Sequence, residues 1–246
     1  MGKIVAIGGG NLRQKSTLVI DQAIIALTGK TLPKFLFIPT ASSDDPKYAE
    51  IMTQYYRDLG CETDTLWLLT RHPDLAKIKA QIQAADIIYV GGGNTLKMLR
   101  RWRKLGIDRL LRQAYQAGKV LCGVSAGAIC WFAGGHSDSM SFYDPKNWQY
   151  IRVSGLGLLP GTHCPHYDSA TLGVKRADSF QAMMQARGGV GIAIEDDCAL
   201  AFVDGQYRVL SGNNKQAYVL RKIRGQMVIQ TLTVDQGWQP VSNLAA

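Results

Sequence analysis

Short runs of apolar residues, many of them β-branched, alternate in the first half of the chain with longer stretches that are apolar on one side only. The short runs predict strands at residues 4–7, 34–39, 63–69, 86–90 and 120–124. The longer stretches predict helices near residues 17–27, 47–59, 75–84, 95–104 and 108–117. This alternation is typical of parallel strands that are joined by crossover helices.

Beyond about residue 150 the pattern changes to short strands separated by Gly, Asn and Asp. A strand is expected at residues 153–159, and others at 191–194, 199–203, 207–210, 217–221 and 227–232. Several of these should form antiparallel hairpins at the sheet edge. No repeat or linker separates the two halves. We therefore expect one α/β domain over residues 1–246, with a mostly parallel central sheet flanked by helices.

Composition narrows the class of protein. The chain has 28 Lys and Arg against 19 Asp and Glu, a formal charge of +9 that could attract an acidic ligand. The basic residues are scattered and lie in no aromatic-rich motif, so we expect no nucleic-acid partner. The five cysteines lack metal-site or disulfide spacing, which predicts buried free thiols and no metal. Because no segment reads as a signal peptide or membrane span, we expect a cytoplasmic protein with no membrane partner.

The segment Gly123-Val124-Ser125-Ala126-Gly127 is the most informative motif. A G-x-S-x-G that follows a strand and opens a helix forms a sharp turn, which exposes the serine hydroxyl at the end of the strand. Glycines on both sides avoid collisions in that turn. The Ala126 N–H at the start of the helix is well placed to bind an oxyanion. The motif predicts that Ser125 is a nucleophile.

A serine nucleophile needs a base, and the chain has four histidines. His72 precedes Pro73 in a predicted surface loop, whereas His136, His163 and His166 all follow Ser125, in the order that α/β hydrolases use. We favour His166 because Pro165 fixes the backbone before it. The spacing cannot rank the acids that compete to orient this base, which are Asp138, Asp168 and the run Glu195-Asp196-Asp197.

Two further glycine clusters follow predicted strands. Gly91-Gly92-Gly93-Asn94-Thr95 leads into a helix, and its bare backbone could supply a second oxyanion donor. Gly8-Gly9-Gly10 lacks the full G-x-G-x-x-G pattern of a dinucleotide site. We therefore expect no cofactor.

Together, Tyr89–Thr95, Gly123–Ala128, Pro165-His166-Tyr167 and Ile38-Pro39-Thr40-Ala41-Ser42 resemble the peptidase E family, the S51 serine peptidases, which include the more distant cyanophycinases. The similarity spans roughly residues 1–215 and implies a class I glutamine amidotransferase-like fold. It implies Ser125 as nucleophile, His166 as base and Asp138 as acid. The Gly92–Gly93 turn and Ala126 would form the oxyanion hole. Substrate contacts are implied for Asn94, Thr95, Tyr167 and Arg176.

The best-known activity of this family is hydrolysis of dipeptides with an N-terminal aspartate, so a small peptide is the expected substrate. The chain departs from the short dipeptidases in a loop at residues 142–148 and in an extension over residues 216–246. These departures leave Glu195 open as the acid. They also motivate an alternative function, that of a non-catalytic module that binds a ligand or partner. A second alternative function is that of an esterase or amidase that uses the same Ser-His pair. The sequence also leaves a homodimer open.

Overall fold

The computed structural model describes residues 2–71 and 74–244 of the chain, so His72 lies outside the described residues. Its α-helices are α1 (Leu18–Ala26), α2 (Pro46–Asp58), α3 (Leu75–Ala84), α4 (Thr95–Leu105), α5 (Ile107–Gln116), α6 (Ala126–Ile129) and α7 (Arg176–Arg187). Its strands are β1 (Lys3–Ile7), β2 (Lys34–Ile38), β3 (Glu62–Thr65), β4 (Ile87–Val90), β5 (Val120–Val124), β6 (Phe132–Ser137), β7 (Ile151–Ser154), β8 (Leu159–Cys164), β9 (Ala170–Thr171), β10 (Val174–Lys175), β11 (Val190–Ile194), β12 (Cys198–Val203), β13 (Gln206–Ser211), β14 (Ala217–Ile223), β15 (Gln226–Leu232) and β16 (Gln239–Pro240).

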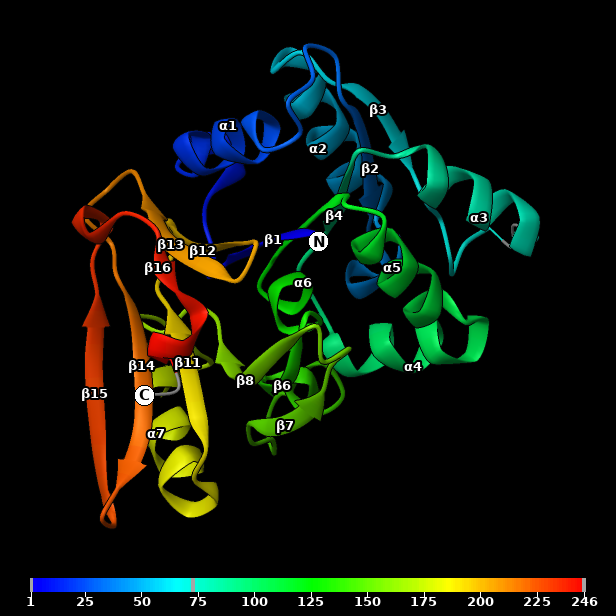
Figure 1. The fold of residues 1–246 in the computed structure, drawn as a ribbon. Coiled ribbons are helices and arrows are strands. Elements are labelled where there is room, and N and C mark those ends of the chain that lie inside the picture. The colour runs from blue at the N-terminus through cyan, green and yellow to red at the C-terminus, as the bar shows by residue number, and fades with distance from the viewer. Residues whose placement is uncertain (1, 72–73, 245–246) are drawn as a thin grey trace.

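The first sheet has the strand order β16-β13-β12-β1-β5-β4-β2-β3. Strands β1, β5, β4, β2 and β3 are parallel, and β12, β13 and β16 extend this group in antiparallel fashion. Successive residues of β1 face opposite sides, because side chains alternate along a strand. Ile4 packs into the hydrophobic cluster that contains α3, α4 and α5, whereas Val5 packs into the one that contains α1 and α2. Helices therefore cover both faces of this sheet (Figure 1).

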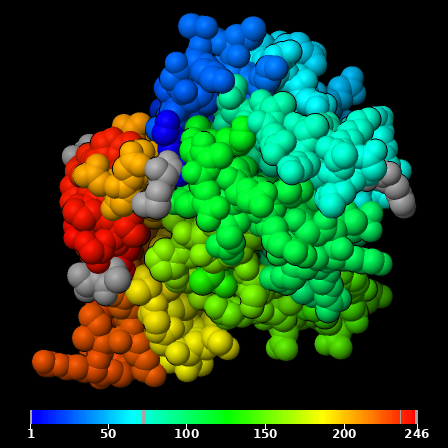
Figure 2. Space-filling model, turned by 45° about the vertical axis from the view of Figure 1, so that its right-hand side comes forward, coloured from blue at the N-terminus to red at the C-terminus, as the bar shows by residue number. Residues whose placement is uncertain are grey.

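The second sheet has the order β15-β14-β11-β8-β6-β7, with β6, β8 and β11 parallel. Helix α7 packs against it and buries Phe180 and Met184. Phe132 of β6 contacts Phe202 of β12, with the ring centroids 6.1 Å apart, so side chains of the two sheets share one core. The β14–β15 hairpin projects from the body at the lower left (Figures 1 and 2).

The predicted α/β class is confirmed, although the strands divide into two mixed sheets rather than a single one. Helix 75–84 and strand 120–124 have the predicted bounds. The strand predicted at 153–159 is wrong, because the chain ends β7 at Ser154 and begins β8 at Leu159. Gly157 adopts a positive φ of 69° there, which glycine tolerates and which breaks the extended backbone. Strand β6 and helix α7 were not predicted.

Two further observations concern the class of protein. All five cysteines are free and buried, as predicted. Within residues 2–71 and 74–244, every helix is too short or too polar to cross a bilayer.

Candidate active site

Ser125 lies directly after β5, at the carboxyl edge of the parallel strands of the first sheet. Its backbone N–H donates to the carbonyl of Ile7, the last residue of β1, over 3.1 Å. On the other side, β5 pairs with β4, which leads into the Gly91–Gly93 turn. The serine therefore sits between two strand ends that are both followed by glycines.

The turn at Ser125 is a strained elbow. Ser125 has φ 56° and ψ −114°, a conformation that L-residues rarely adopt and that the surrounding structure must hold in place. A Cβ on Gly123 would lie 2.5 Å from the Gly127 carbonyl oxygen, and one on Gly127 would lie 2.0 Å from the Val90 carbonyl oxygen. Only glycines allow helix α6 to approach β5 and the end of β4 this closely.

The backbone of the Gly91–Gly93 turn lies beside the serine. A Cβ built on Gly92 would be 3.4 Å from Cβ of Ser125 and 4.0 Å from its Oγ. Gly93 has φ 133° and packs against the Ala41 carbonyl. Burial raises the pKa of the nearby Tyr48 phenol to about 12, although a backbone hydrogen bond from Gly92 acts to lower it. The turn thus contacts Ala41, which lies in one of the family-like segments, and Tyr48, which the sequence did not indicate.

The helix that follows Ser125 is short. Helix α6 has only four residues, so its dipole is small, because a large dipole needs several aligned peptide units. The amide of Ala126 is in the first turn, where helical N–H groups lack an intrahelical acceptor. The individual N–H group, rather than a long helix, is what remains to stabilise an oxyanion.

His166 comes from the second sheet and meets the same edge. It follows β8, has a φ of 51°, and donates its backbone N–H to the Gly8 carbonyl over 3.3 Å. The backbones of Ser125 and His166 are thus both bound at the end of β1, by the consecutive residues Ile7 and Gly8. The imidazole Nδ1 lies 2.5 Å from Oδ1 of Asp196, and the histidine side chain is 28% exposed.

The acid beside His166 differs from the residue expected. Asp138 instead pairs with Arg176, with Oδ2 2.5 Å from Nη2. Glu195 accepts hydrogen bonds from the Tyr218 hydroxyl at 2.7 Å and from the Gln216 N–H at 2.9 Å. The expectation that Asp138 or Glu195 lies beside His166 is therefore corrected, since the carboxylate in that place is Asp196, one of the acids that spacing could not rank. The reason is topological, since β11 is parallel to β8 and brings Asp196 to the same edge.

The environment of Asp196 favours a carboxylate. Burial alone would raise the pKa of this carboxyl, but hydrogen bonds from His166 and Ser169 and the charge of Lys215 hold it below its usual value. An ionised acceptor can bind and orient the histidine ring.

The contacts of Gly9 show why the Gly8-Gly9-Gly10 turn needs a glycine at this position. A Cβ at this position would lie 1.9 Å from Oδ1 of Asp196 and 2.3 Å from Nδ1 of His166. Gly9 also forms an isolated parallel bridge with Asp196. The cluster thus gives the histidine and the acid room to meet, a role that its sequence pattern did not reveal.

Arg176 forms the charged part of a neighbouring buried group. It is 3% exposed, donates to Asp138 and Thr171, and lies 5.2 Å over the ring of Tyr150. Among the described residues, its Nη1 atom is buried with no hydrogen-bond partner. The group is linked to the Ser125 edge through Ser139, whose carbonyl accepts from the side chain of Asn94 at 3.3 Å.

The other residues predicted to bind substrate have partners within the protein. Asn94 caps α4 by accepting from the Lys97 N–H at 3.0 Å, and the Thr95 hydroxyl accepts from Ser137 at 3.2 Å. The Tyr167 hydroxyl accepts from Gln181 at 2.9 Å, and all three predicted side chains are buried.

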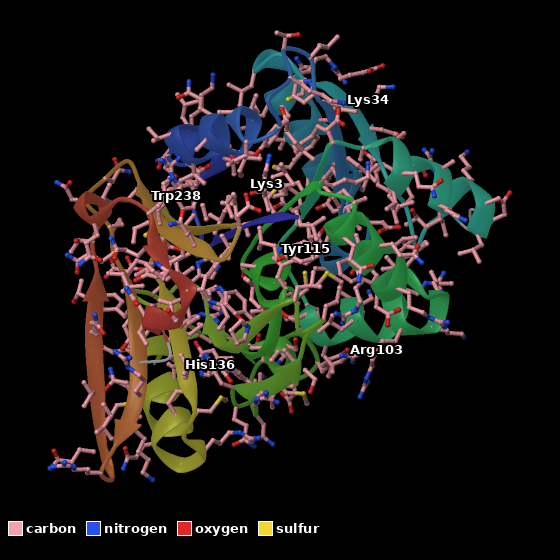
Figure 3. The ribbon with its side chains drawn as sticks, in the orientation of Figure 1. Lys3, Lys34, Arg103, Tyr115, His136 and Trp238 are labelled. Atoms are coloured by element: carbon pink, nitrogen blue, oxygen red, sulfur yellow. The ribbon has the colours of Figure 1, made fainter. Side chains whose placement is uncertain are left out.

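The two remaining described histidines are fully buried. His136 lies beside α7, where its Nε2 is 2.9 Å from the Ser179 hydroxyl (Figure 3). His163 Nδ1 is 3.0 Å from the Ile192 carbonyl, and its ring stacks on Phe132. Burial lowers the pKa of each to about 3, so both are neutral at physiological pH. In the part of the chain that the structure describes, no cluster of His, Cys, Asp or Glu is arranged to hold a metal ion.

Comparison with known proteins finds several peptidases. Residues 4–210 match the sequence model of Peptidase family S51. An uncharacterized peptidase of Bacillus subtilis, YgaJ, is 34% identical over 221 residues, which cover 89% of this chain and 91% of that protein. Peptidase E of Shewanella denitrificans is 32% identical over 162 residues, 64% of each chain. The crystal structure of a peptidase from an acI-B1 actinobacterium shares the fold, with a TM-score of 0.75 and 18% identity, and covers 98% of this chain and 97% of its own.

Proposed function

Because the chain belongs to peptidase family S51, we propose that it hydrolyses small peptides through an acyl-enzyme on Ser125, with Asp-Xaa dipeptides as its substrates. The observation that carries this proposal is the strained Ser125 elbow, whose backbone is bound to Ile7 at the end of β1, while the next residue, Gly8, binds the backbone of His166, the partner of Asp196. Strain of this kind is retained where a reactive group needs a fixed position.

In the proposed reaction, His166 accepts the Ser125 proton while the serine oxygen attacks the peptide carbonyl. The N–H groups of Ala126 and the Gly92–Gly93 turn bind the negative oxygen that forms. His166 then donates the proton to the leaving amine. Water repeats these steps on the acyl-enzyme and releases the acid product.

Arg176 supports an aspartyl substrate. A buried guanidinium with an unpartnered nitrogen can bind a substrate carboxylate strongly, because there is little water to compete. The Asp138 carboxylate beside it can in turn attract the free ammonium group of a peptide. An N-terminal aspartate carries both groups on one residue.

The specificity test compares the turnover of Asp-Leu and Ala-Leu by the wild type, Arg176→Gln and Arg176→Lys. Removing one buried charged contact in Arg176→Gln should lower the ratio of kcat/KM for Asp-Leu to kcat/KM for Ala-Leu on the order of 100-fold. This ratio does not depend on the fraction of folded protein. Arg187→Gln, at the exposed far end of α7, is the matched control and should keep the wild-type ratio.

An unchanged ratio in Arg176→Gln would refute the assignment of Arg176 to the substrate carboxylate. Turnover of a p-nitrophenyl ester without peptide hydrolysis would favour an esterase. Absence of all turnover by folded protein would favour a non-catalytic binding module.

A further inference from the structure

A single tight turn carries His166, the proposed base, and also Asp168 and Ser169, which both bind Asp196. The turn runs from His166 to Ser169 and is closed by the Ser169 N–H, which donates to the His166 carbonyl over 2.9 Å. His166 has a positive φ of 51°, so its side chain leaves the turn in a fixed direction. The Ser169 carbonyl in turn accepts from the N–H of Arg176, the first residue of α7, over 3.0 Å.

Both oxygens of the Asp196 carboxylate are bound from this turn. His166 Nδ1 contacts Oδ1 at 2.5 Å, and the Ser169 hydroxyl donates to Oδ2 at 2.8 Å. Without the second contact, the carboxylate could rotate about its terminal torsion, which is broad and weakly restrained in aspartate. The serine hydroxyl fixes the rotation that presents Oδ1 to the imidazole.

The backbone of Asp196 is held from the same turn. Its N–H donates to Oδ1 of Asp168 over 2.9 Å, and the other oxygen of Asp168 pairs with Lys215 Nζ at 2.7 Å. The Asp168 pair raises the pKa of Lys215. The acid is thus tied at its backbone by Asp168 and at its side chain by Ser169.

We infer that Ser169 and Asp168 are positioning residues that set the orientation of Asp196, and through it the hydrogen-bonded state of His166. This inference rests on the proposed function, since it assigns His166 as the base. Neither residue contacts a reacting atom. Both act on the acid from the turn that carries the base.

The kinetic test uses Ser169→Ala, with Ser169→Thr as the variant that keeps a hydroxyl and Ser154→Ala, an exposed serine on β7, as the control. Loss of one hydrogen bond to a charged acceptor should lower kcat about ten-fold and leave KM unchanged. The Asp196 pKa should rise, so the acidic limb of the pH–rate profile should move to higher pH. Ser169→Thr should recover most of kcat and the wild-type profile.

Asp168→Ala should also lower kcat. Asp168→Asn retains an acceptor oxygen and should restore most of kcat.

A second readout does not require turnover. In the wild type, the proton between His166 Nδ1 and Asp196 should give a downfield NMR signal that disappears in Asp196→Asn. Ser169→Ala should shift or broaden this signal, and Ser154→Ala should not. A Ser169→Ala variant with wild-type kcat, pH profile and NMR signal would overturn the inference. If Ser125→Ala remained active, the proposed function would fail instead, and the NMR comparison would still decide the role of Ser169.

Discussion

Replacing Asp196 with asparagine tests which acid orients the base. When Nδ1–H of His166 donates to the Asp196 carboxylate, Nε2 of the neutral ring carries no proton and can receive one from Ser125. An asparagine amide at position 196 can instead donate to Nδ1, which puts the imidazole proton on Nε2. In a related Ser-His-Asp triad, this wrong tautomer lowers kcat by a factor on the order of 10⁴, or about 5.5 kcal/mol of barrier. We expect a loss of ~10³–10⁴ in kcat for Asp196→Asn with little change in KM.

The assay is steady-state hydrolysis of Asp-Leu by Asp196→Asn, Asp138→Asn and Glu195→Gln, with each fold checked by circular dichroism. Asp138 bonds to Arg176, so Asp138→Asn should act mainly on KM. Glu195 bonds to Gln216 and Tyr218, and Glu195→Gln should lose less than about ten-fold in kcat. A folded Asp196→Asn enzyme with near wild-type kcat, together with an inactive Asp138→Asn enzyme, would refute this assignment.

Two other predictions follow from buried groups. Gly9→Ala should lower kcat by about 100-fold or more in a folded protein, because its Cβ would meet Asp196 Oδ1 at 1.9 Å and separate the acid from His166; wild-type kinetics would contradict this. His136 and His163 have pKa values near 3 in the fold and an ordinary value of 6.5. As the pH falls below about 6.5, both histidines take up protons in the unfolded state but stay neutral in the fold. Each histidine should therefore lower the free energy of unfolding by about 1.4 kcal/mol per pH unit down to about pH 3. Urea unfolding at pH 7 and pH 5 should show a smaller loss in His136→Gln than in wild type, and an equal loss would argue against a neutral buried His136.

The sharp turn at Ser125 was predictable because its determinants are local. The glycines at 123 and 127 lie two residues from Ser125, and the requirement for them is visible in the sequence as a strand, a tight turn and a helix start. Most elements of the first sheet were predictable for a similar reason, since each long strand and helix has its own periodicity. The two-residue strand β16 was not predicted, and β3 ends at Thr65 rather than at residue 69.

The acid could not be chosen from the sequence because its contact is not local. Asp196 and His166 are 30 residues apart and follow two parallel strands, β11 and β8, whose register only the folded sheet defines. Asp138 follows β6 in the same sheet, so spacing alone gave it an equal claim. The contact between Gly9 and this pair likewise depends on how the second sheet meets β1.

The ends of strands in the second half of the chain were also hard to predict. The apolar residues at 153–159 suggested one strand, but Gly157 allows a bend, and a Cβ on Gly155 would lie 2.3 Å from the Phe132 carbonyl oxygen. This close backbone approach is a tertiary contact, which local propensity does not encode.

The most direct test of the account is covalent trapping of Ser125. Purified protein is treated with a phosphonate that carries an aspartyl side chain, and the adduct is located by intact-mass measurement and peptide mapping. We predict one adduct per chain, on Ser125, with none in Ser125→Ala and much slower labelling in His166→Ala. An enzyme that hydrolyses Asp-Leu yet is labelled on another residue, or is not labelled at all, would contradict the claim that Ser125 is the nucleophile.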